Sequence, residues 1–467
     1  MNRRSPEGWA RVGLADLCTL NPPKPRPSEV ESDAPVTFVP MPAVDANTGT
    51  ITNPELRMFG DVRKGYKSFQ NNDVILAKIT PCFENGKAAV CRDLLGGLGF
   101  GSTEFHVLRS NGTVLTMYVY HFVRQKSFRR EGAANMTGSV GQKRVPVDWV
   151  SAVPIPLPPL AEQKRIVAKV EALLARVNAA RARLAKVPAI LRRFRQSVLA
   201  AACSGQLTAD WREEHPETTA LEKSRYRAAL DSICEGFQYG TSSKSQTGGK
   251  VPVLRMGNIQ NGKIDWSDLA FTSTPEEIGK YSLKPGTVLF NRTNSPELVG
   301  KTAIYRGERP AIFAGYLIRI LHGDGLNPEY LNYCLNAPEF REYCSRVKTD
   351  GVSQSNINAK KLAAYELPYC HPTEQDEIIR RVEVLFALAD KIEARVQAAT
   401  ARVEKITQTI LAKAFRGELV PTEAELARQE GRDYEPASIL LERIRAARAT
   451  NDTRKTRKSK SRGRRKK

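Results

Sequence analysis

Four short segments of the sequence contain residue types that could do chemistry. Ser295-Pro-Glu-Leu-Val-Gly-Lys-Thr302 resembles a phosphate-binding loop, in which backbone amides of glycines surround phosphates and a lysine contacts them. Ser295 replaces the first glycine of that pattern, and Pro296 restricts the loop backbone. Gly96-Gly-Leu-Gly-Phe-Gly101 is followed by a β-type run where a cofactor loop would begin a helix. We therefore predict no nucleotide site at 295–302 and a flexible loop at 96–101.

The other two segments also have simpler interpretations. Asn21-Pro-Pro-Lys24 resembles the Asn-Pro-Pro-aromatic motif of amino-methyltransferases, but Lys24 offers no ring on which a flipped base could stack. We predict a turn before a strand there. Glu162-Gln-Lys164 resembles the end of a nuclease carboxylate–lysine motif, yet a second copy of the triplet has Asp376 in place of the lysine. We interpret both triplets as helix starts.

Histidines and cysteines give no sign of a metal site. The eight cysteines contain no Cys-x-x-Cys pair, and the five histidines are scattered. This distribution predicts neither a zinc site nor a disulfide framework, and it fits a reducing cytoplasm. Since no catalytic triad or pair of catalytic carboxylates stands out either, we expect a binding protein without catalytic residues and without a cofactor of its own.

Composition points to a polyanionic partner. The 467 residues include 72 Lys and Arg against 50 Asp and Glu, a formal net charge of +22. Such an excess favours nucleic acid as the partner. The segment Asp452–Lys467 holds ten basic residues and one acidic residue, so we expect a disordered arm that adds non-specific phosphate contacts. The sequence contains neither a secretory leader pattern nor an apolar run of about 18 residues, so we expect a cytoplasmic protein.

Polar residues in glycine-bounded loops are the candidates for DNA contacts. Lys and Arg suit phosphates and guanine O6/N7, whereas Asn and Gln suit adenine N6/N7. Most polar loop residues make no such contact, so each is a weak candidate by itself and the set is more persuasive. The candidates are Lys64, Tyr66, Lys67, Lys78, Asn85, Lys87, Gln142, Lys143, Arg144, Ser243, Lys244, Gln246, Arg255, Asn258, Gln260, Asn261, Lys263, Asn291, Arg292, Asn294, Ser353, Gln354 and Asn356.

An internal repeat organises the elements that would position these residues. Pro154–Gln163 recurs loosely as Glu366–Gln375, and one offset of 212 residues then holds for about fifty residues without a gap. Apolar residues recur within both copies at alternating steps of three and four, which is the signal of a coiled-coil seam. Pro188 is expected to kink or split the first helix. The seam residues are Ile166, Val170, Leu173, Val177, Leu184, Leu191, Ile378, Val382, Leu385, Ile392, Val396 and Val403.

The segments before each helix are of a different type. Strand-like runs occur at 36–40 and 72–80 before the first helix, and at 251–256 and 286–290 before the second. Helical stretches near 114–129 and 328–343 follow them. The predicted fold class is therefore α+β, with two tandem mixed α/β domains separated by two long helices that pair as an antiparallel coiled coil. The expected boundaries are a first domain at 1–153, a first helix region at 154–210, a second domain at 211–365, a second helix region at 366–420, and a C-terminal helix with the basic tail at 421–467.

Several segments together resemble a known family. They are Pro154–Gln163, Val187–Gln196, Ala200–Thr208, Tyr239–Ser242, Val251–Ile259, Gly351–Ile357, Ala412–Val420 and Glu435–Ile444. In their duplicated order they resemble the DNA-specificity (S) subunit of type I restriction–modification systems.

The resemblance implies a division of labour among subunits. Each domain would be a target-recognition domain that reads one half of a bipartite, asymmetric site in double-stranded DNA. The helices would set the spacer and dock two methyltransferase subunits. A restriction subunit, where present, would add translocation and cleavage. S-adenosylmethionine, ATP and Mg²⁺ would belong to the partner subunits.

Three alternatives stay open at this point. One is the specificity module of another restriction–modification architecture. The second is a self-contained methyltransferase or nuclease, which would bind S-adenosylmethionine or cleave DNA by itself. The third is a coiled-coil scaffold with no role on DNA.

Overall fold

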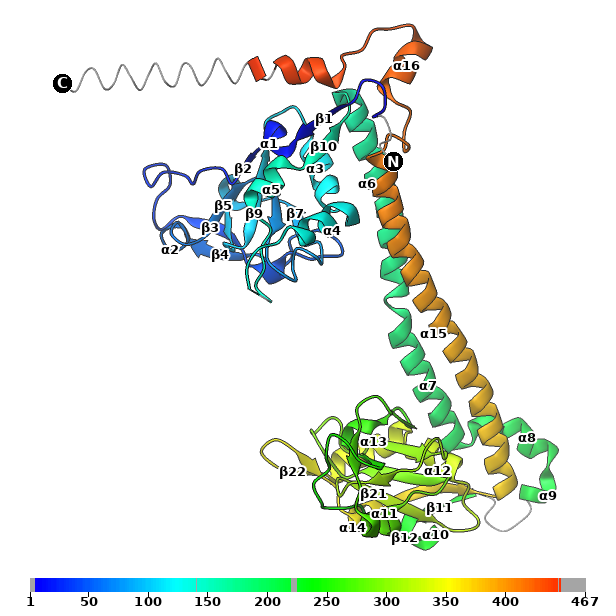
Figure 1. Cartoon of the computed structure of the whole chain (residues 1–467). Coiled ribbons are helices and arrows are strands. Elements are labelled where there is room, and N and C mark those ends of the chain that lie inside the picture. Colours follow the sequence, from blue (N-terminus) through cyan, green and yellow to red (C-terminus); the bar gives the residue numbers. More distant parts are fainter. Residues whose placement is uncertain (1–4, 140, 220–224, 444, 447–467) are drawn as a thin grey trace. The chain divides into compact units, whose positions relative to one another are not determined.

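The computed structural model describes residues 5–139, 141–219, 225–443 and 445–446 (Figure 1). The expected basic arm at Asp452–Lys467 lies outside these residues. The chain divides into two compact units, one formed by residues 1–184 with 398–467 and the other by residues 185–397. We call them unit 1 and unit 2. Each contains one α+β body, domain 1 (residues 10–157) or domain 2 (residues 225–370), together with parts of the long helices.

Domain 1 contains two four-stranded sheets, and helices α3 (Thr116–Val123) and α4 (Lys126–Ala134) follow their last strand. One sheet has the order β2-β9-β6-β7 and the other the order β4-β3-β8-β5. The strands are β2 Cys18–Leu20, β3 Pro35–Val39, β4 Glu55–Met58, β5 Lys67–Gln70, β6 Val74–Ala77, β7 Ala88–Val90, β8 Leu98–Gly101 and β9 Phe105–Ser110. The predicted strands at 36–40 and 72–80 are confirmed as β3 and β6, and the predicted helical stretch is divided in two.

The prediction of a flexible loop at Gly96–Gly101 is wrong. Its second half is strand β8, which pairs in parallel with β3 and antiparallel with β5. Gly99 lies so close to the ring of Phe69 that a Cβ there would approach a ring carbon to 2.4 Å. The glycines therefore allow neighbouring side chains to pack tightly on a buried strand.

Domain 2 repeats this plan. Its main sheet has the order β12-β21-β17-β19, and a second sheet has the order β16-β13-β20. The strands are β12 Cys234–Tyr239, β13 Val251–Leu254, β16 Ala270–Thr272, β17 Thr287–Asn291, β19 Thr302–Tyr305, β20 Ile312–Phe313 and β21 Leu317–His322. Helices α12 (Pro328–Cys334) and α13 (Pro338–Val347) correspond to α3 and α4. The predicted strands at 251–256 and 286–290 are confirmed as β13 and β17.

A strand precedes each long helix and belongs to the domain before it. β10 (Pro154–Leu157) pairs antiparallel with β1 (Ala10–Gly13). β24 (Glu366–Cys370) pairs in the same way with β11 (Arg225–Ala229). The structure thus extends both domains a few residues beyond the boundaries expected from the sequence.

The long helices begin after these strands. The first helix is divided into α6 (Leu160–Leu184) and α7 (Val187–Ser204), and Pro188 lies in the first turn of α7. This is the split that Pro188 predicts, because proline fits the first turn of a helix and not its interior. The second helix, α15 (Pro372–Ala414), is continuous. Gly205 follows α7 and Gly417 lies shortly after α15, both with positive φ.

Within each unit the helices pair antiparallel. In unit 1, Arg181 of α6 binds Glu404 of α15 at 3.0 Å, and Ile166 and Val170 are buried in a core cluster that also contains Leu411. The later residue of α6, Arg181, lies beside the earlier of the two α15 residues, Glu404. The two helices therefore run in opposite directions.

Unit 2 repeats the pairing, again with an arginine on the first helix and carboxylates on α15. Arg195 of α7 binds Asp390 and Glu393 of α15 at 2.6 and 2.9 Å, and Figure 1 shows these helices side by side. Among the predicted seam residues Leu191, Ile378 and Val382 are buried, Leu173, Val177, Leu184, Leu385, Val396 and Val403 are half-buried, and Ile392 is 36% exposed.

A glutamine at the start of α6 joins the helix to domain 1. The buried side chain of Gln163 accepts a hydrogen bond from the backbone N–H of Leu115 at 2.9 Å. Its amide donates to the carbonyls of Thr113 and Pro158 at 3.2 and 3.0 Å. One side chain therefore satisfies three backbone groups, two of them in the loop before α3.

Gln375 makes the same three hydrogen bonds at the start of α15. It accepts from Asn327 N–H at 2.8 Å and donates to Gly325 and Cys370 carbonyls at 3.0 and 2.8 Å. Each partner lies 212 residues after its counterpart in unit 1. The repeat thus preserves hydrogen bonds as well as elements.

The glutamate before each glutamine forms hydrogen bonds with the segment that follows the other long helix. Glu162 accepts hydrogen bonds from the Nε1 of Trp9 and from the backbone N–H of Glu423, both at 2.9 Å. Glu423 begins α16 (Glu423–Glu430), which follows α15. Burial raises the pKa of Glu162, so these two donors offset the desolvation of its charged form.

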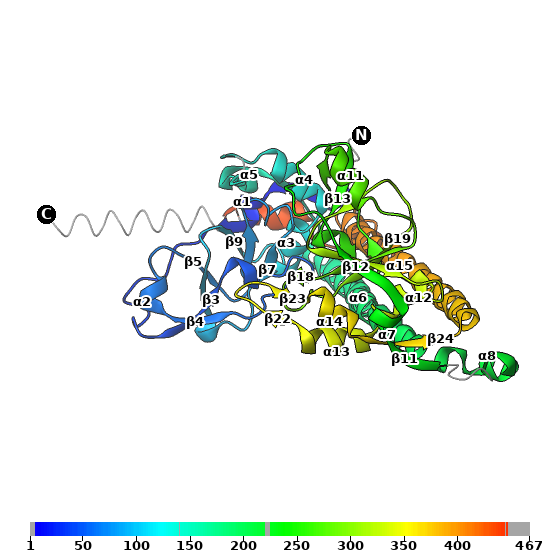
Figure 2. The same ribbon diagram turned by 90° about the horizontal axis from the view of Figure 1, so that it is seen from below.

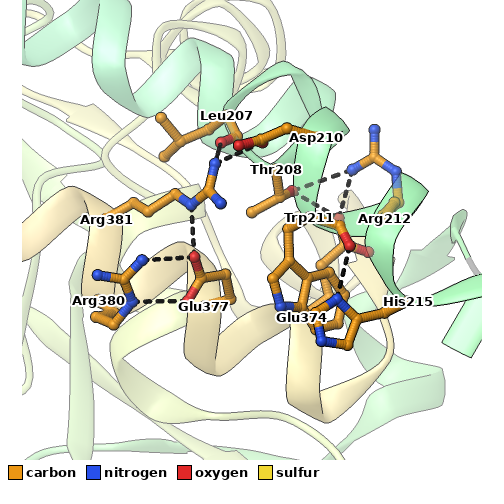
Figure 3. A network of polar contacts seen from close by, with 10 residues as sticks. All are labelled: Leu207, Thr208, Asp210, Trp211, Arg212, His215, Glu374, Glu377, Arg380 and Arg381. Carbon is orange, nitrogen blue, oxygen red and sulfur yellow. Dashed lines mark hydrogen bonds and ion pairs between the residues drawn. The ribbon is translucent and has the colours of Figure 1, made fainter.

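Glu374 makes the equivalent hydrogen bonds in unit 2. It accepts from Thr208 Oγ1 at 2.8 Å and from Arg212 at 2.6 Å, in the segment after α7 (Figure 3). About two turns further along α15, Arg381 binds both Glu377 and Asp210 of α8 (Ala209–Glu214). Each long helix is therefore fixed at its start to the segment that leaves the other, as antiparallel pairing requires.

The segment after α15 also packs against domain 1 and the residues that precede it. The backbone N–H of Ala437 donates to Gly8 O at 3.0 Å, and Arg428 binds Glu7 at 2.9 Å. Ala437 and Leu441 are buried in the same cluster as β1 and β10. Helix α16 lies within residues 421–467, where a C-terminal helix is expected.

Replacing Gln163 with leucine should destabilise unit 1. The change leaves the Leu115 N–H and two carbonyls buried without partners, which costs about 2–3 kcal/mol of the free energy of unfolding. Urea titration of the full chain measures this loss. Gln397→Leu, at an exposed position of α15, is the matched control and should cost less than about 0.5 kcal/mol. Equal costs for the two variants would contradict the role given to Gln163.

The ion pairs of Glu377 should make unit 2 sensitive to acid. Hydrogen bonds from Arg380, and from Arg381 at 2.5 Å, lower the pKa of Glu377 from 4.5 to about 2. A carboxylate with a depressed folded-state pKa stabilises the fold above its unfolded pKa, and this contribution is lost as the pH falls from about 4.5 to 2. Glu377→Gln should therefore lower the urea midpoint at pH 7 and lower it much less at pH 3. The exposed Glu383→Gln serves as the control, and an effect of Glu377→Gln that is independent of pH would contradict this account.

Candidate nucleic-acid interface

Lys78 is the first residue after the central strand β6 of domain 1. Its backbone N–H donates to the carbonyl of Glu104 at 2.9 Å, and its carbonyl accepts from the N–H of Val145 at 2.9 Å. These two hydrogen bonds fix the backbone between β9 and the segment that precedes α5 (Val147–Ala152). The half-buried lysine is thus held on a rigid frame at the end of the sheet.

Arg292 takes the same place after β17 in domain 2. Its N–H donates to Tyr316 O at 3.0 Å, and its carbonyl accepts from Ile357 N–H at 2.9 Å. Both partners lie 212 residues after those of Lys78, while Arg292 itself lies 214 residues after Lys78. Because of this local shift of two residues, the 212-residue repeat does not align Lys78 with Arg292 in the sequence. The matching hydrogen bonds show that the two residues are equivalent.

A short hairpin lies beside Lys78. Thr137 and Arg144 exchange backbone hydrogen bonds at 3.0 and 2.8 Å, and Arg144 also bridges to Ile79, the residue after Lys78. Gln142 and Lys143 are exposed at the tip. The hairpin therefore presents polar side chains next to the end of β6.

Domain 2 has the equivalent hairpin in a more regular form. β22 (Thr349–Asp350) and β23 (Ser355–Asn356) pair antiparallel, and β23 also pairs with β18 (Thr293–Asn294), directly after Arg292. Figure 2 shows these three strands together. Ser353 and Gln354 are exposed at the tip of the hairpin.

The polar surface in domain 1 is dominated by lysines. Burial lowers the pKa of Lys67, and the charges of Lys78 and Lys24 lower it further, so both of these lysines lie near Lys67. Arg144 is paired instead with Glu104, whose carboxylate it binds at 2.9 and 3.0 Å. A compact group of lysines held near one another suits contacts with DNA phosphates.

The surface in domain 2 is built around a guanidinium. The Arg292 guanidinium lies 4.8 Å from the ring centre of Tyr239, and one of its amino groups is 3.4 Å from Asn356 Oδ1. Asn356 is itself fixed by a 2.8 Å hydrogen bond to Thr293 Oγ1. Arg292 Nε has no hydrogen-bond partner among the described residues. An oriented arginine beside an asparagine is a pairing suited to base edges.

Several predicted contact residues have structural roles in these domains instead. Lys87 donates to Met41 O at 2.9 Å, and the ring of Tyr66 packs edge-on against Phe38. The buried amide of Asn258 donates to two backbone carbonyls. Gln260 is held by Lys301 at 2.9 Å, and Asn261 has positive φ in the turn between β14 (Ile259–Gln260) and β15 (Lys263–Ile264). Such contacts favour fold stability over DNA binding for this group.

The remaining candidates are dispersed. The structure brings Lys67, Lys78, Gln142, Lys143 and Arg144 together in domain 1, and Arg292, Asn294, Ser353, Gln354 and Asn356 together in domain 2. Asn291 is fully buried beside Arg292. Lys64, Asn85, Ser243, Lys244 and Gln246 are exposed on other loops, Lys263 is exposed on β15, and Arg255 pairs with Asp268 at 3.3 Å.

Sequence reasoning missed two members of these groups. Lys24 lies close to Lys67, and Tyr239 stacks on Arg292 while its hydroxyl accepts a hydrogen bond from Ala359 N–H at 3.0 Å. Lys24 belongs to the Asn21–Lys24 segment, which we considered only as a possible methyltransferase motif. Tyr239 belongs to the Tyr239–Ser242 segment that carries the family resemblance, but nothing in that segment predicts a contact with an arginine.

Comparison with known proteins decides the family. The family model described as "Type I restriction modification DNA specificity domain" matches residues 6–189 and 229–399, which is most of the chain in two copies. The chain belongs to this family. It is a specificity subunit with two target-recognition domains, domains 1 and 2, and its homologues are DNA-binding subunits that are non-catalytic on their own.

Individual relatives agree with this assignment. The chain is 34% identical to the specificity subunit of the type I restriction enzyme EcoKI of Escherichia coli K12, over 76% of each chain. Its fold is similar to the crystal structure of the HsdS subunit of Thermoanaerobacter tengcongensis, with a TM-score of 0.54 and 24% identity over 89% of this chain and 99% of that one. It is more similar, at a TM-score of 0.71, to a chain from a study of assembly of the type I R-M system, with 24% identity over 89% of this chain and all of that one.

The motifs set aside in the sequence have structural explanations in the specificity subunit. Glu162 and Gln163 are buried hydrogen-bonding residues at a helix start, and Ser295–Gly300 leads into strand β19 rather than a helix. Asn21 has positive φ in a turn after β2. None of the helices in the described part of the chain combines the length and apolar character needed to span a bilayer.

Proposed function

We propose that each target-recognition domain reads one half of a bipartite site in double-stranded DNA, mainly through the residue after its central strand and the neighbouring hairpin. The observation that carries this proposal is the equivalence of Lys78 and Arg292, which two matching hydrogen bonds fix on the same frame. A cation in one position on both domains, next to a polar hairpin, is what two related half-site readers would share.

The two halves of the site differ in this proposal. Domain 1 offers a group of lysines, whereas domain 2 offers the Arg292–Asn356 pair. Arg292 suits bidentate contact with guanine O6/N7, and Asn356 suits adenine N6/N7. Because the side chains differ on a shared frame, the site is asymmetric.

The long helices set the spacer between the half-sites. Their antiparallel pairing is maintained by a buried seam and by ion pairs at Arg181–Glu404 and Arg195–Asp390. A paired rod changes length only when both helices change together, since a change in one alone would break the seam.

The same helices dock methyltransferase subunits. On α15, Val384, Leu388 and Ile392 are 60%, 51% and 36% exposed at steps of four residues, which is one face of the helix. In unit 1 a largely apolar groove runs between α6 and α15 and is bordered by basic residues. It is lined by Leu173, Arg402, Lys405, Ile406, Thr409, Ile410, Lys413 and Leu419. Contiguous exposed apolar surface of this kind marks a protein interface.

We propose the following composition for the complex. Two methyltransferase subunits bind the helices, one for each half of the repeat, and supply S-adenosylmethionine chemistry. A restriction subunit, where the system has one, supplies ATP- and Mg²⁺-dependent cleavage. The specificity subunit then contributes recognition and positioning.

Arg292→Lys should weaken recognition of one half-site only. The variant retains the charge but loses the fork that contacts a base edge, so the affinity for the cognate duplex should fall by about 1–3 kcal/mol. Affinity for a scrambled duplex should change little, because phosphate contacts depend on charge. Competition binding with the complete methyltransferase complex measures both. Arg346→Lys, exposed on α13, is the matched control. Equal weakening on cognate and scrambled DNA would contradict base reading by Arg292.

Insertion of one heptad into both helices should lengthen the spacer alone. The insertions go between Ala182 and Arg183 and between Arg402 and Val403, beside the Arg181–Glu404 pair, and a heptad keeps the seam in phase. Seven residues add about 10 Å, or about three base pairs. Mapping of methylated bases in cells should show the same half-sites with a longer spacer. An unchanged spacer in an active complex would contradict the ruler role.

A further inference from the structure

Unit 1 contains a cavity of about 560 Å³ that DNA recognition does not explain. It is lined by residues from the loop at 46–51, from the segments at 85–86 and 90–93, from α3 and α4, and from the facing turns of α6 and α15. This volume lies within the range of about 300–1,000 Å³ typical of small-molecule sites. It is well above what a bare phosphate ion needs.

The outer wall of the cavity is preformed. Arg124 donates to the carbonyls of Ala46 and Asn47, both at 2.8 Å, and to the Tyr120 hydroxyl at 2.6 Å. Gly49 has positive φ, and a Cβ there would collide with the Tyr120 hydroxyl, so only glycine allows this approach. The loop at 46–51 is therefore fixed against α3 before any ligand enters.

Four arginines line the cavity, and three of them, Arg92, Arg124 and Arg129, form no ion pair with a carboxylate of the described residues. The fourth, Arg181, pairs with Glu404. Arg129 donates to Glu84 O at 2.9 Å, and its buried Nε has no partner there. Burial and the nearby charge of Arg124 lower the pKa of Arg129, and the charge of Glu404 offsets only part of this effect. An anion would supply the missing partner.

The rest of the wall is mixed. Arg92, Asp93, Glu171, Arg181 and Glu404 also line it, and of these Arg181 and Glu404 form an ion pair. Met117, Leu174 and Leu411 line it together with the ring of Tyr120. His121 is buried, its Nε2 has no hydrogen-bond partner among the described residues, and burial lowers its pKa to about 3. The imidazole is thus neutral at physiological pH. A ligand that fits must combine an anionic group with a less polar body.

The equivalent region of unit 2 is filled by side chains. Tyr333 replaces His121 and Phe386 replaces Leu174 at the 212-residue offset. The two rings contact each other edge-on with their centres 6.0 Å apart. The cavity in unit 1 therefore arises because His121 and Leu174 are smaller than Tyr333 and Phe386, which fill the equivalent space in unit 2.

We propose that this cavity binds a mononucleotide, with its phosphate at Arg129 and Arg124 and its base against Leu174, Met117 and Tyr120. The phosphate takes the place of the missing counter-ion, and the flat base fills the space that Phe386 and Tyr333 occupy in the other copy. This site involves no residue of the two hairpins, so it is independent of the proposed DNA contacts.

Calorimetric titration of the full chain with AMP, GMP and CMP tests the proposal, with adenosine and inorganic phosphate as partial ligands. At least one nucleotide should bind at one per chain. Adenosine and phosphate should each bind at least about tenfold more weakly, since each lacks one half of the contacts. Absence of binding by all three nucleotides, or binding of phosphate as tight as that of the nucleotides, would overturn the proposal.

Three variants locate the site. Arg129→Gln should weaken nucleotide binding by about tenfold or more, whereas Arg130→Gln, its exposed neighbour on α4, should leave it unchanged. The double variant His121→Tyr, Leu174→Phe transfers the filling pair of unit 2 and should abolish binding. Its thermal unfolding, with that of Arg129→Gln, verifies that the fold is intact, and duplex DNA binding should stay the same in all three. Undiminished nucleotide affinity in both cavity variants would overturn the assignment.

Discussion

The architecture depends on two buried polar side chains at the start of each long helix. A buried amide or carboxylate is tolerated only when its hydrogen bonds are satisfied, and Glu162 with Gln163, like Glu374 with Gln375, finds its partners only in one arrangement. The glutamine fixes the helix to the domain before it, and the glutamate fixes it to the segment that leaves the other helix. Antiparallel pairing follows from these bonds as much as from the apolar seam.

Duplication of this frame separates stability from recognition. The backbone positions of Lys78 and Arg292 are fixed by the same pair of hydrogen bonds, so their side chains differ without cost to the sheet. His121 and Tyr333 are likewise different side chains at equivalent positions of the frame. Unit 1 has a cavity there, whereas Tyr333 fills the space in unit 2. A specificity subunit benefits from this arrangement, because new target sequences require new side chains on an unchanged frame.

The repeat, the seam and the main strands could be predicted from the sequence because they rest on periodic apolar residues. The predictions went wrong or remained incomplete where tertiary packing overrides local pattern. Gly99 looks like a loop residue and lies in a buried strand beside Phe69. Asn258 and Lys87 look like surface contacts and instead satisfy backbone carbonyls. The match of Lys78 with Arg292 was hidden by two inserted residues, and only backbone hydrogen bonds reveal it.

Exchange of one recognition domain tests the central claim most directly. Residues 225–370 would be replaced by the corresponding segment of another specificity subunit, with both glutamate–glutamine pairs retained, and methylated bases would be mapped in cells that also express the methyltransferase. We predict a bipartite motif in which one half changes while the other half and the spacer stay the same. A motif that changes in both halves, or one that forms a single contiguous block, would contradict the account.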